Sequence, residues 1–130
     1  MSNRYAKHFS LAQAREELTT VIPILETIAQ LKIDLDKKGY NIYRHQYFGG
    51  MGPNGQKVFP AEMEQLVIHV QDLNHRGIEL KDLEKGLIDF PSLRASGEEV
   101  YLCYMLGEAT IDHWHTLEGG YAARRPIEEL

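Results

Sequence analysis

The sequence lacks the features that would place the chain in an oxidising compartment, in a membrane or on a nucleic acid. It has one cysteine, Cys103, so no disulfide can form within the chain, which fits a reducing compartment. No stretch approaches the ~18 consecutive apolar residues of a membrane helix, and residues 1–9 contain no apolar run of signal-peptide length. Lys and Arg number 14 against 19 Asp and Glu, and the net charge of −5 predicts no nucleic-acid partner. We therefore predict a cytoplasmic protein without membrane association.

What is present is the composition of one ordinary folded domain. The chain has 130 residues, of which 43% are apolar and 25% are charged, close to the average for globular proteins. A chain of this length buries about two-thirds of its unfolded surface, so it needs neither a disulfide nor a metal to fold. We predict a single domain over residues 1–130, with a helical pair in 10–77 and a β-meander with a C-terminal tail in 78–130.

The first half predicts a long amphipathic helix that begins after Ser10 and ends near Gly39. Ser10 and Gln13 have the spacing of a capping box. Pro23 lies inside the helix, where it removes a hydrogen bond and clashes with the preceding turn, so we predict a kink or a break near it. The apolar stripe, interrupted only by Lys32, consists of residues three and four positions apart: Leu11, Ala14, Leu18, Val21, Leu25, Ile28 and Leu35.

A second helix that begins at Pro60 and ends before Gly77 should pack antiparallel against the first, each covering the apolar stripe of the other. Pro60 suits the first helical position, and Gly77 suits the position just past the end of a helix.

The connection between the helices, residues 39–59, contains Gly50, Gly52 and Gly55 with the spacing G-x-G-x-x-G. A dinucleotide site would need a strand before these glycines and a helix starting at the last one, and here a helix precedes them. A plain helix-to-helix connection is therefore favoured, while its length leaves a role as a lid or partner contact open.

Residues 78–130 predict a small antiparallel β-meander packed on the long antiparallel helical pair, which makes the fold α+β. Residues 87–90 have the composition of a strand that is stopped by Pro91. Residues 100–105 are the strongest strand, because they are rich in β-branched, aromatic and apolar side chains. Residues 111–115 alternate apolar and polar side chains, which is typical of a strand, although a helix stays open.

His113 and His115 flank Trp114 and are candidates for sharing a metal ion. Residues two apart on a strand point to the same face, and two imidazoles about 7 Å apart can bind one ion. Asp89 or Glu108 could add a carboxylate, which would complete a set common for zinc or non-haem iron. On a helix the two histidines would diverge and the shared site would fail. The competing interpretation, which we favour, makes both histidines hydrogen-bonded groups around a buried Trp114.

Three further features have both a structural and a functional interpretation. Asp89 lies in an apolar strand and must be paired if buried, with Arg124 or Arg125 as the expected partner; the alternative is a general base. Cys103 lies in mid-strand, which favours a small buried apolar side chain over a nucleophile. Arg124 and Arg125 follow a Gly-Gly-Tyr segment and suit either an anion site or a solvated tail.

Short segments of the second half together resemble a known family. They are GIELKDL at 77–83, GLIDFP at 86–91, VYLCY at 100–104, GE at 107–108, WH at 114–115 and GGY at 119–121, followed by Arg124. The chain thereby resembles the uncharacterised, mainly bacterial family known as domain of unknown function 2203, over nearly its whole length. Tyr104 stands where tryptophan is expected in such proteins, and Tyr121 where phenylalanine is more usual. The resemblance implies a small cytosolic protein without an assigned activity.

Three interpretations of the site remain, and none of them names a substrate or a reaction. The resemblance favours a pocket for a small polar or anionic ligand, without a cofactor. The second interpretation is an interaction module, a homodimer in which the same polar residues form an ion-pair network. The third is a divalent-metal site at His113, His115 and Glu108. The predicted pocket consists of the motif residues Asp89, Glu108, His115 and Arg124, with Trp114 and Tyr121 as apolar walls.

Overall fold

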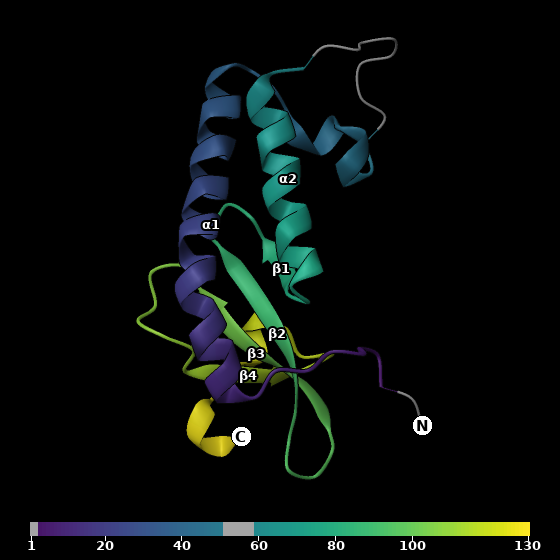
Figure 1. Cartoon of the computed structure of the whole chain (residues 1–130), viewed down its shortest axis with the longest axis vertical. Helices are drawn as coiled ribbons and strands as arrows, with labels where there is room; N and C mark the ends of the chain where they lie inside the picture. Colours follow the sequence, from purple (N-terminus) through teal and green to yellow (C-terminus); the bar gives the residue numbers. More distant parts are fainter. Residues whose placement is uncertain (1–2, 51–58) are drawn as a thin grey trace.

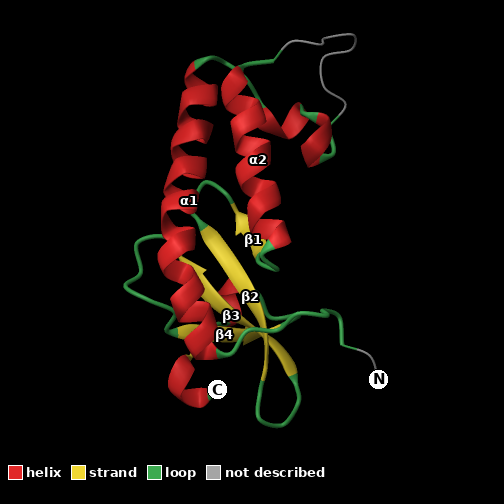
Figure 2. Cartoon of the chain, viewed as in Figure 1, coloured by secondary structure: helices red, strands yellow, loops and turns green. Residues whose placement is uncertain are grey.

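A computed structural model describes residues 3–50 and 59–130 and shows two α-helices and a five-stranded sheet (Figure 1). Figure 2 shows the two long helices above and beside the strands, so the predicted α+β class is confirmed. Within the described residues, no helix combines the length and the apolar character needed to cross a membrane. The main elements are α1 (Leu11–Lys37), α2 (Ala61–His75), β1 (Glu79–Asp82), β2 (Leu87–Leu93), β3 (Glu99–Met105), β4 (His113–Thr116) and β5 (Arg125–Pro126).

Helix α1 begins where the sequence predicts, because Ser10 caps its first turn. The Ser10 hydroxyl accepts a hydrogen bond from the Gln13 amide at 3.1 Å, and the Gln13 side chain accepts one from the Ser10 amide at 2.9 Å. This reciprocal arrangement is the predicted capping box. The helix runs without interruption through Pro23, so it is not broken in two there, while a bend at Pro23 stays a prediction. Gly39, with a φ of 71°, follows the helix end.

Helices α1 and α2 lie side by side and run in opposite directions (Figure 1). Pro60 occupies the cap position of α2, so the helix begins at Ala61, one residue later than the sequence predicts. Buried side chains of both helices belong to one apolar cluster. Lys32 interrupts this face of α1, and its ammonium group is held by Asp36 at 2.6 Å and by Glu84 at 2.9 Å.

The strands form one antiparallel meander in the order β1-β2-β3-β4-β5. Residues 111–115, which the sequence left open between strand and helix, contain the start of strand β4. Strand β5 was not predicted, because two residues are too few to give a periodic signal. Gly52 and Gly55 of the G-x-G-x-x-G spacing lie outside the described residues.

The prediction that Pro91 stops the second strand is wrong, because β2 continues through it to Leu93. The Pro91 carbonyl accepts a hydrogen bond from the Phe9 amide at 2.8 Å, and pairing of β2 with β1 has already ended at Asp89. A strand residue directs its amide nitrogen and its carbonyl to the same side. The nitrogen of Pro91 therefore faces the side of β2 that β1 no longer covers, where a strand tolerates the missing donor.

Side chains on the strands alternate between two faces with different chemistry. On one face, apolar side chains join those of the helices in the core. On the opposite face, Asp89, Cys103 and His115 are buried but lie outside that apolar cluster. The helix-facing residues of the sheet are Ile88, Phe90, Val100, Leu102, Tyr104 and Trp114.

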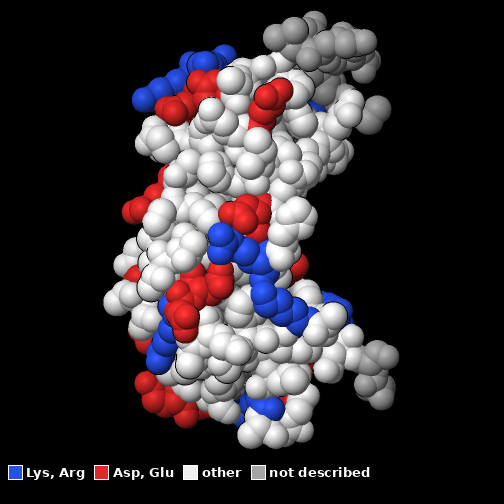
Figure 3. Space-filling view, in the orientation of Figure 1, with Lys and Arg blue, Asp and Glu red and all other residues white. Residues whose placement is uncertain are grey.

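Charged side chains are mixed over the surface. Figure 3 shows Lys and Arg interspersed with Asp and Glu on the face that it displays. Several form pairs, such as Lys38 and Glu62 at 2.8 Å, and a pair this exposed stabilises the fold by about 0–1 kcal/mol. The exclusion of nucleic acid as a partner stays a prediction.

Candidate functional site

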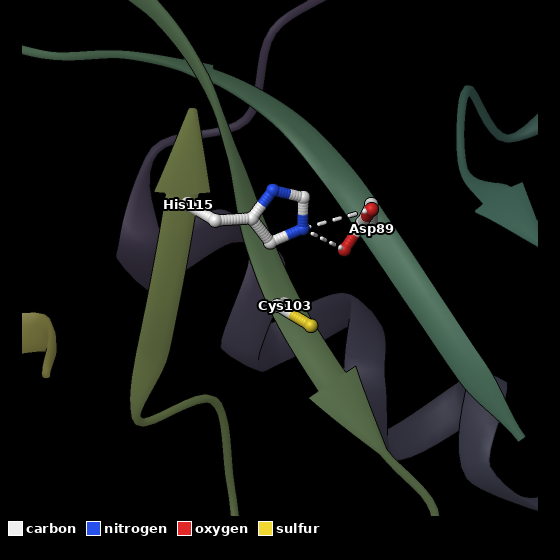
Figure 4. Close-up of side chains that lie close together, drawn as sticks. All are labelled: Asp89, Cys103 and His115. Carbon is white, nitrogen blue, oxygen red and sulfur yellow. Dashed lines mark hydrogen bonds and ion pairs between the residues drawn. The ribbon is translucent and has the colours of Figure 1, made fainter. Parts of the chain in front are cut away.

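Three buried polar side chains meet on the face of the sheet that is turned away from the core (Figure 4). Asp89 on β2, Cys103 on β3 and His115 on β4 come from neighbouring strands. Asp89 lies opposite Cys103, while His115 lies two residue pairs along, opposite Tyr101. Their exposed fractions are 1%, 1% and 2%, so bulk water hardly competes for their polar atoms. We call these three residues the Asp–Cys–His cluster.

Asp89 and His115 form a buried ion pair within this cluster. Nε2 of His115 lies 3.1 Å from both carboxylate oxygens of Asp89, and Nδ1 lies 2.7 Å from the backbone oxygen of Thr116. Because both partners are acceptors, each ring nitrogen donates a proton in this arrangement. Burial disfavours the charged imidazolium, but the hydrogen bond and the charge of Asp89 outweigh burial, and the pKa of His115 is raised.

Cys103 completes the cluster as a protonated thiol. One ligand atom from each of the three residues lies within 4.8 Å of the other two. Burial, followed by the negative charge of Asp89, raises the pKa of the Cys103 thiol to about 12. The cysteine is free and buried, as the sequence predicts, and at neutral pH a thiol with this pKa is a poor nucleophile.

Glu108 and Arg124 form a second ion pair, next to the cluster. Nη1 of Arg124 lies 3.0 Å from both carboxylate oxygens of Glu108, and Oε1 of Glu108 also accepts a hydrogen bond from the Met105 amide at 2.7 Å. The guanidinium group lies 4.2 Å from the centre of the Tyr121 ring. The pair therefore ties the turn after β3 to the segment that precedes β5.

Asp89 does not pair with Arg124 or Arg125, so that prediction is wrong. Arg124 is engaged by Glu108, and the guanidinium of Arg125 lies 5.5 Å from the Trp114 ring. The register of β3 and β4 instead brings a histidine to Asp89. Asp89 is thus structurally paired, which was the favoured expectation, but with a different partner.

Trp114 and His113 were also predicted as site residues, and neither belongs to the cluster. Trp114 points to the opposite face of the sheet and belongs to the apolar core. His113 shares the face of His115, but its Nδ1 lies 3.7 Å from Glu108, whereas His115 is engaged by Asp89. The two histidines therefore face different carboxylates.

A pocket of about 190 Å³ opens onto the Asp89–His115 pair. Tyr121 also lines it, whereas Glu108, Arg124 and Trp114 do not, so half of the predicted pocket residues are brought together. A larger hollow of about 510 Å³ shares Lys81 with this pocket, and none of the residues that line it is a buried ionisable group. The other residues around the smaller pocket are Lys81, Leu87, Tyr101, Leu117, Glu118 and Gly120.

A comparison with protein families matches residues 7–127 to the family described as Uncharacterized conserved protein (DUF2203). The chain belongs to the DUF2203 family. The match includes the whole Asp–Cys–His cluster and confirms the resemblance that the short segments indicate. No curated protein and no solved structure matches the chain significantly. What this DUF2203 protein does must therefore be argued from its site.

Sequence reasoning missed Lys81 and Tyr101, which line the pocket of this DUF2203 protein, and Tyr5, which contacts Tyr101. The Tyr101 hydroxyl contacts the Tyr5 hydroxyl, and the Lys81 ammonium lies 4.9 Å from the centre of the Tyr101 ring. Tyr101 precedes Cys103 by two residues, so alternation along the strand would have placed both on one face. Tyr5 gave no such signal, because it reaches the site from a segment without periodicity.

Proposed function

We propose that this DUF2203 protein binds a small polar or anionic molecule in the pocket above the Asp89–His115 pair. One observation carries the proposal: an ion pair that is otherwise fully buried forms the floor of a pocket of about 190 Å³. A buried ion pair is weak evidence for stability, because apolar side chains of similar volume often stabilise a fold as well. A buried pair that a cavity reaches is a typical candidate for binding or catalysis.

The pocket walls indicate the chemistry of the ligand. Its volume equals that of about six water molecules, at roughly 30 Å³ each in the liquid, so the ligand is small. Lys81 supplies a positive charge at the rim, while Leu87 and Leu117 supply apolar surface. The floor offers the carboxylate of Asp89 as an acceptor. A compact molecule with an anionic group toward Lys81 and a polar group toward the floor fits this arrangement best.

The test is an NMR titration of the 15N-labelled full chain with phosphate, acetate, succinate and glycine. At least one probe should shift the amides of His115, Gly120 and Tyr121 in a saturable manner. Lys81→Met should weaken the response, whereas Lys85→Met should not, because Lys85 is a nearby lysine that does not line this pocket. Flat titrations for all four probes, or equal effects of the two lysine variants, would contradict the proposal.

A second candidate has its own supporting observation. Glu108 and Arg124 are hydrogen-bonded to each other, as expected of a structural ion-pair network in an interaction module. The homodimer that goes with this interpretation stays a proposal, which sedimentation velocity would test by the mass of the particle in solution. A cytoplasmic location is likewise a proposal, supported by the single, unpaired cysteine.

A further inference from the structure

We propose that the Asp–Cys–His cluster is a site for one divalent metal ion of the zinc class. Its donors are a carboxylate oxygen of Asp89, Sγ of Cys103 and Nε2 of His115, which lie within 4.8 Å of one another. A set of thiolate, imidazole and carboxylate suits zinc and similar transition metals, whereas magnesium and calcium prefer oxygen donors alone. The site goes beyond the proposed pocket ligand and does not depend on it.

The spacing of the three donors is close to what a tetrahedral ion needs. Bonds of about 2.0–2.3 Å to oxygen, nitrogen and sulfur place neighbouring donors about 3.3–3.6 Å apart. Asp89 and His115 are already at 3.1 Å, and the sulfur lies at most 4.8 Å from either. Binding therefore requires shifts of about 1 Å, within reach of small side-chain rotations, with the three strands left in place.

The second nitrogen of His115 is held as in a metal-binding histidine. Its Nδ1 lies 2.7 Å from the Thr116 carbonyl oxygen, to which it donates a proton. Histidines that bind metals almost always make such a hydrogen bond, because it fixes the ring and leaves the other nitrogen free for the ion. Nε2 points at the carboxylate of Asp89, so the ring is already turned toward the proposed site (Figure 4).

The charges in the cluster balance when a divalent ion enters. Without it, the cluster holds the Asp89 carboxylate, the His115 imidazolium and the neutral Cys103 thiol, which sum to zero. The ion displaces the proton from Nε2 and the proton from Sγ, so two protons leave to solvent as one divalent cation binds. The products are a carboxylate, a neutral imidazole, a thiolate and the ion, which again sum to zero. Of the cations next to the cluster, Arg124 is paired with Glu108, while Lys81 lines the pocket.

The pocket gives such an ion an open position. Asp89 and His115 line the pocket, and Sγ of Cys103 lies within 4.8 Å of their donor atoms, so an ion between the three would face the cavity. Three protein ligands and one open position are typical of catalytic zinc sites, whereas structural sites have four protein ligands. A water molecule or an anionic oxygen from the pocket would complete the coordination.

The experiment is a titration of the full chain with cobalt(II), a coloured stand-in for zinc. The protein is prepared without a polyhistidine tag and stripped with a chelator. We expect one cobalt per chain, a thiolate-to-cobalt charge-transfer band in the near ultraviolet, and loss of the colour when one equivalent of zinc is added. Cys103→Ser should remove the band and weaken binding by more than about 100-fold, because loss of an outer hydrogen-bond partner alone costs about 10–100-fold.

Two control variants separate this site from its alternatives. His113→Ala should keep the band, because His113 is the neighbouring histidine outside the cluster. Lys81→Met should also keep it while weakening the response to pocket ligands, so the two proposals can fail separately. The inference is overturned if wild-type protein shows no charge-transfer band at stoichiometric cobalt, or if His113→Ala loses cobalt as fully as Cys103→Ser does. If Cys103→Ser does not fold, the cobalt spectrum of the wild-type protein alone decides the test.

Discussion

Removing one partner of the Asp89–His115 pair should destabilise the fold far more than removing an exposed ion pair. The two side chains are 2% and 3% exposed, so either one left alone would be a buried polar or charged group without its partner and nearly without water. Breaking a buried pair in this way costs about 3–5 kcal/mol. We therefore expect His115→Ala and Asp89→Ala each to lower the free energy of unfolding by this amount in metal-free protein.

The assay is urea unfolding followed by far-ultraviolet circular dichroism, in the presence of a chelator. The double variant Asp89→Ala/His115→Ala should lose less than the sum of the two single losses, because it leaves no unpaired charge. The coupling free energy should fall within about 0.5–3 kcal/mol, the usual range for residues in contact. Lys38→Ala serves as the control, since its partner Glu62 is a surface residue, and it should cost about 0–1 kcal/mol.

Two outcomes would refute this reasoning. Additive losses in the double variant would mean that the pair is not a coupled unit in the folded protein. Single losses no larger than that of Lys38→Ala would mean that solvent reaches the pair despite its low exposure. If a variant changes the slope of the free energy of unfolding against urea concentration, this would indicate an altered unfolded or native ensemble. The coupling free energy alone would then decide the test.

Three further outcomes are expected. With its pKa at about 12, only about one Cys103 thiol in 10,000 is ionised at pH 8, so a thiol reagent should modify it only upon unfolding, as followed by mass spectrometry. Burial opposes ionisation of Glu99, but the hydrogen bonds from His8 and from the backbone amides of Tyr5 and Arg4 lower its pKa. The N-terminal segment should therefore stay bound to Glu99 above the ordinary carboxyl pKa and loosen as pH falls through the lowered value. Glu99→Gln should loosen the segment at neutral pH, as measured by hydrogen exchange of the Tyr5 amide. Ser10→Ala should lower the free energy of unfolding by about 1 kcal/mol, measured by urea denaturation.

The features that could be predicted from the sequence are those that depend on neighbours along the chain. The capping box at Ser10 and the strand predicted over residues 100–105 follow from spacings of two to four residues, and both are present. Period-two alternation likewise places Asp89 inside an apolar strand, where it has to be paired. Such local signals were sufficient for the α+β class and for the region that holds the cluster.

The partner of Asp89 could not be predicted, because it depends on how three strands are aligned. Cys103 lies opposite Asp89, and His115 reaches the same carboxylate only because β4 pairs with β3 two residues away from a direct match. A shift by two residues would have brought His113 there instead, with the same alternation of faces along the strand. The continuation of β2 through Pro91 could not be predicted for a similar reason. Whether the strand tolerates a proline there depends on where β1 ends and on the hydrogen bond from the Phe9 amide.

The segment 117–121 bounds the pocket, and Gly120 sets its path. Gly120 has a φ of 68° and a ψ of −174°, a combination essentially restricted to glycine. An added Cβ would meet nothing within 4 Å, so Gly120→Ala acts through the backbone and not through a clash. We expect a loss of about 1–3 kcal/mol in the free energy of unfolding, or a changed path of the segment that avoids this strain.

Gly97 provides the matched control for this change. It also has a positive φ, 92°, and open space around an added Cβ, but it lies between β2 and β3 and does not line the pocket. Gly97→Ala should therefore lower stability while the amide shifts of Asp89 and His115 stay as in the wild type. Gly120→Ala should move those shifts and alter the cobalt spectrum, because the wall of the pocket is displaced. Equal shifts in both variants would mean that the pocket responds to general destabilisation, and that residues 117–121 do not shape it.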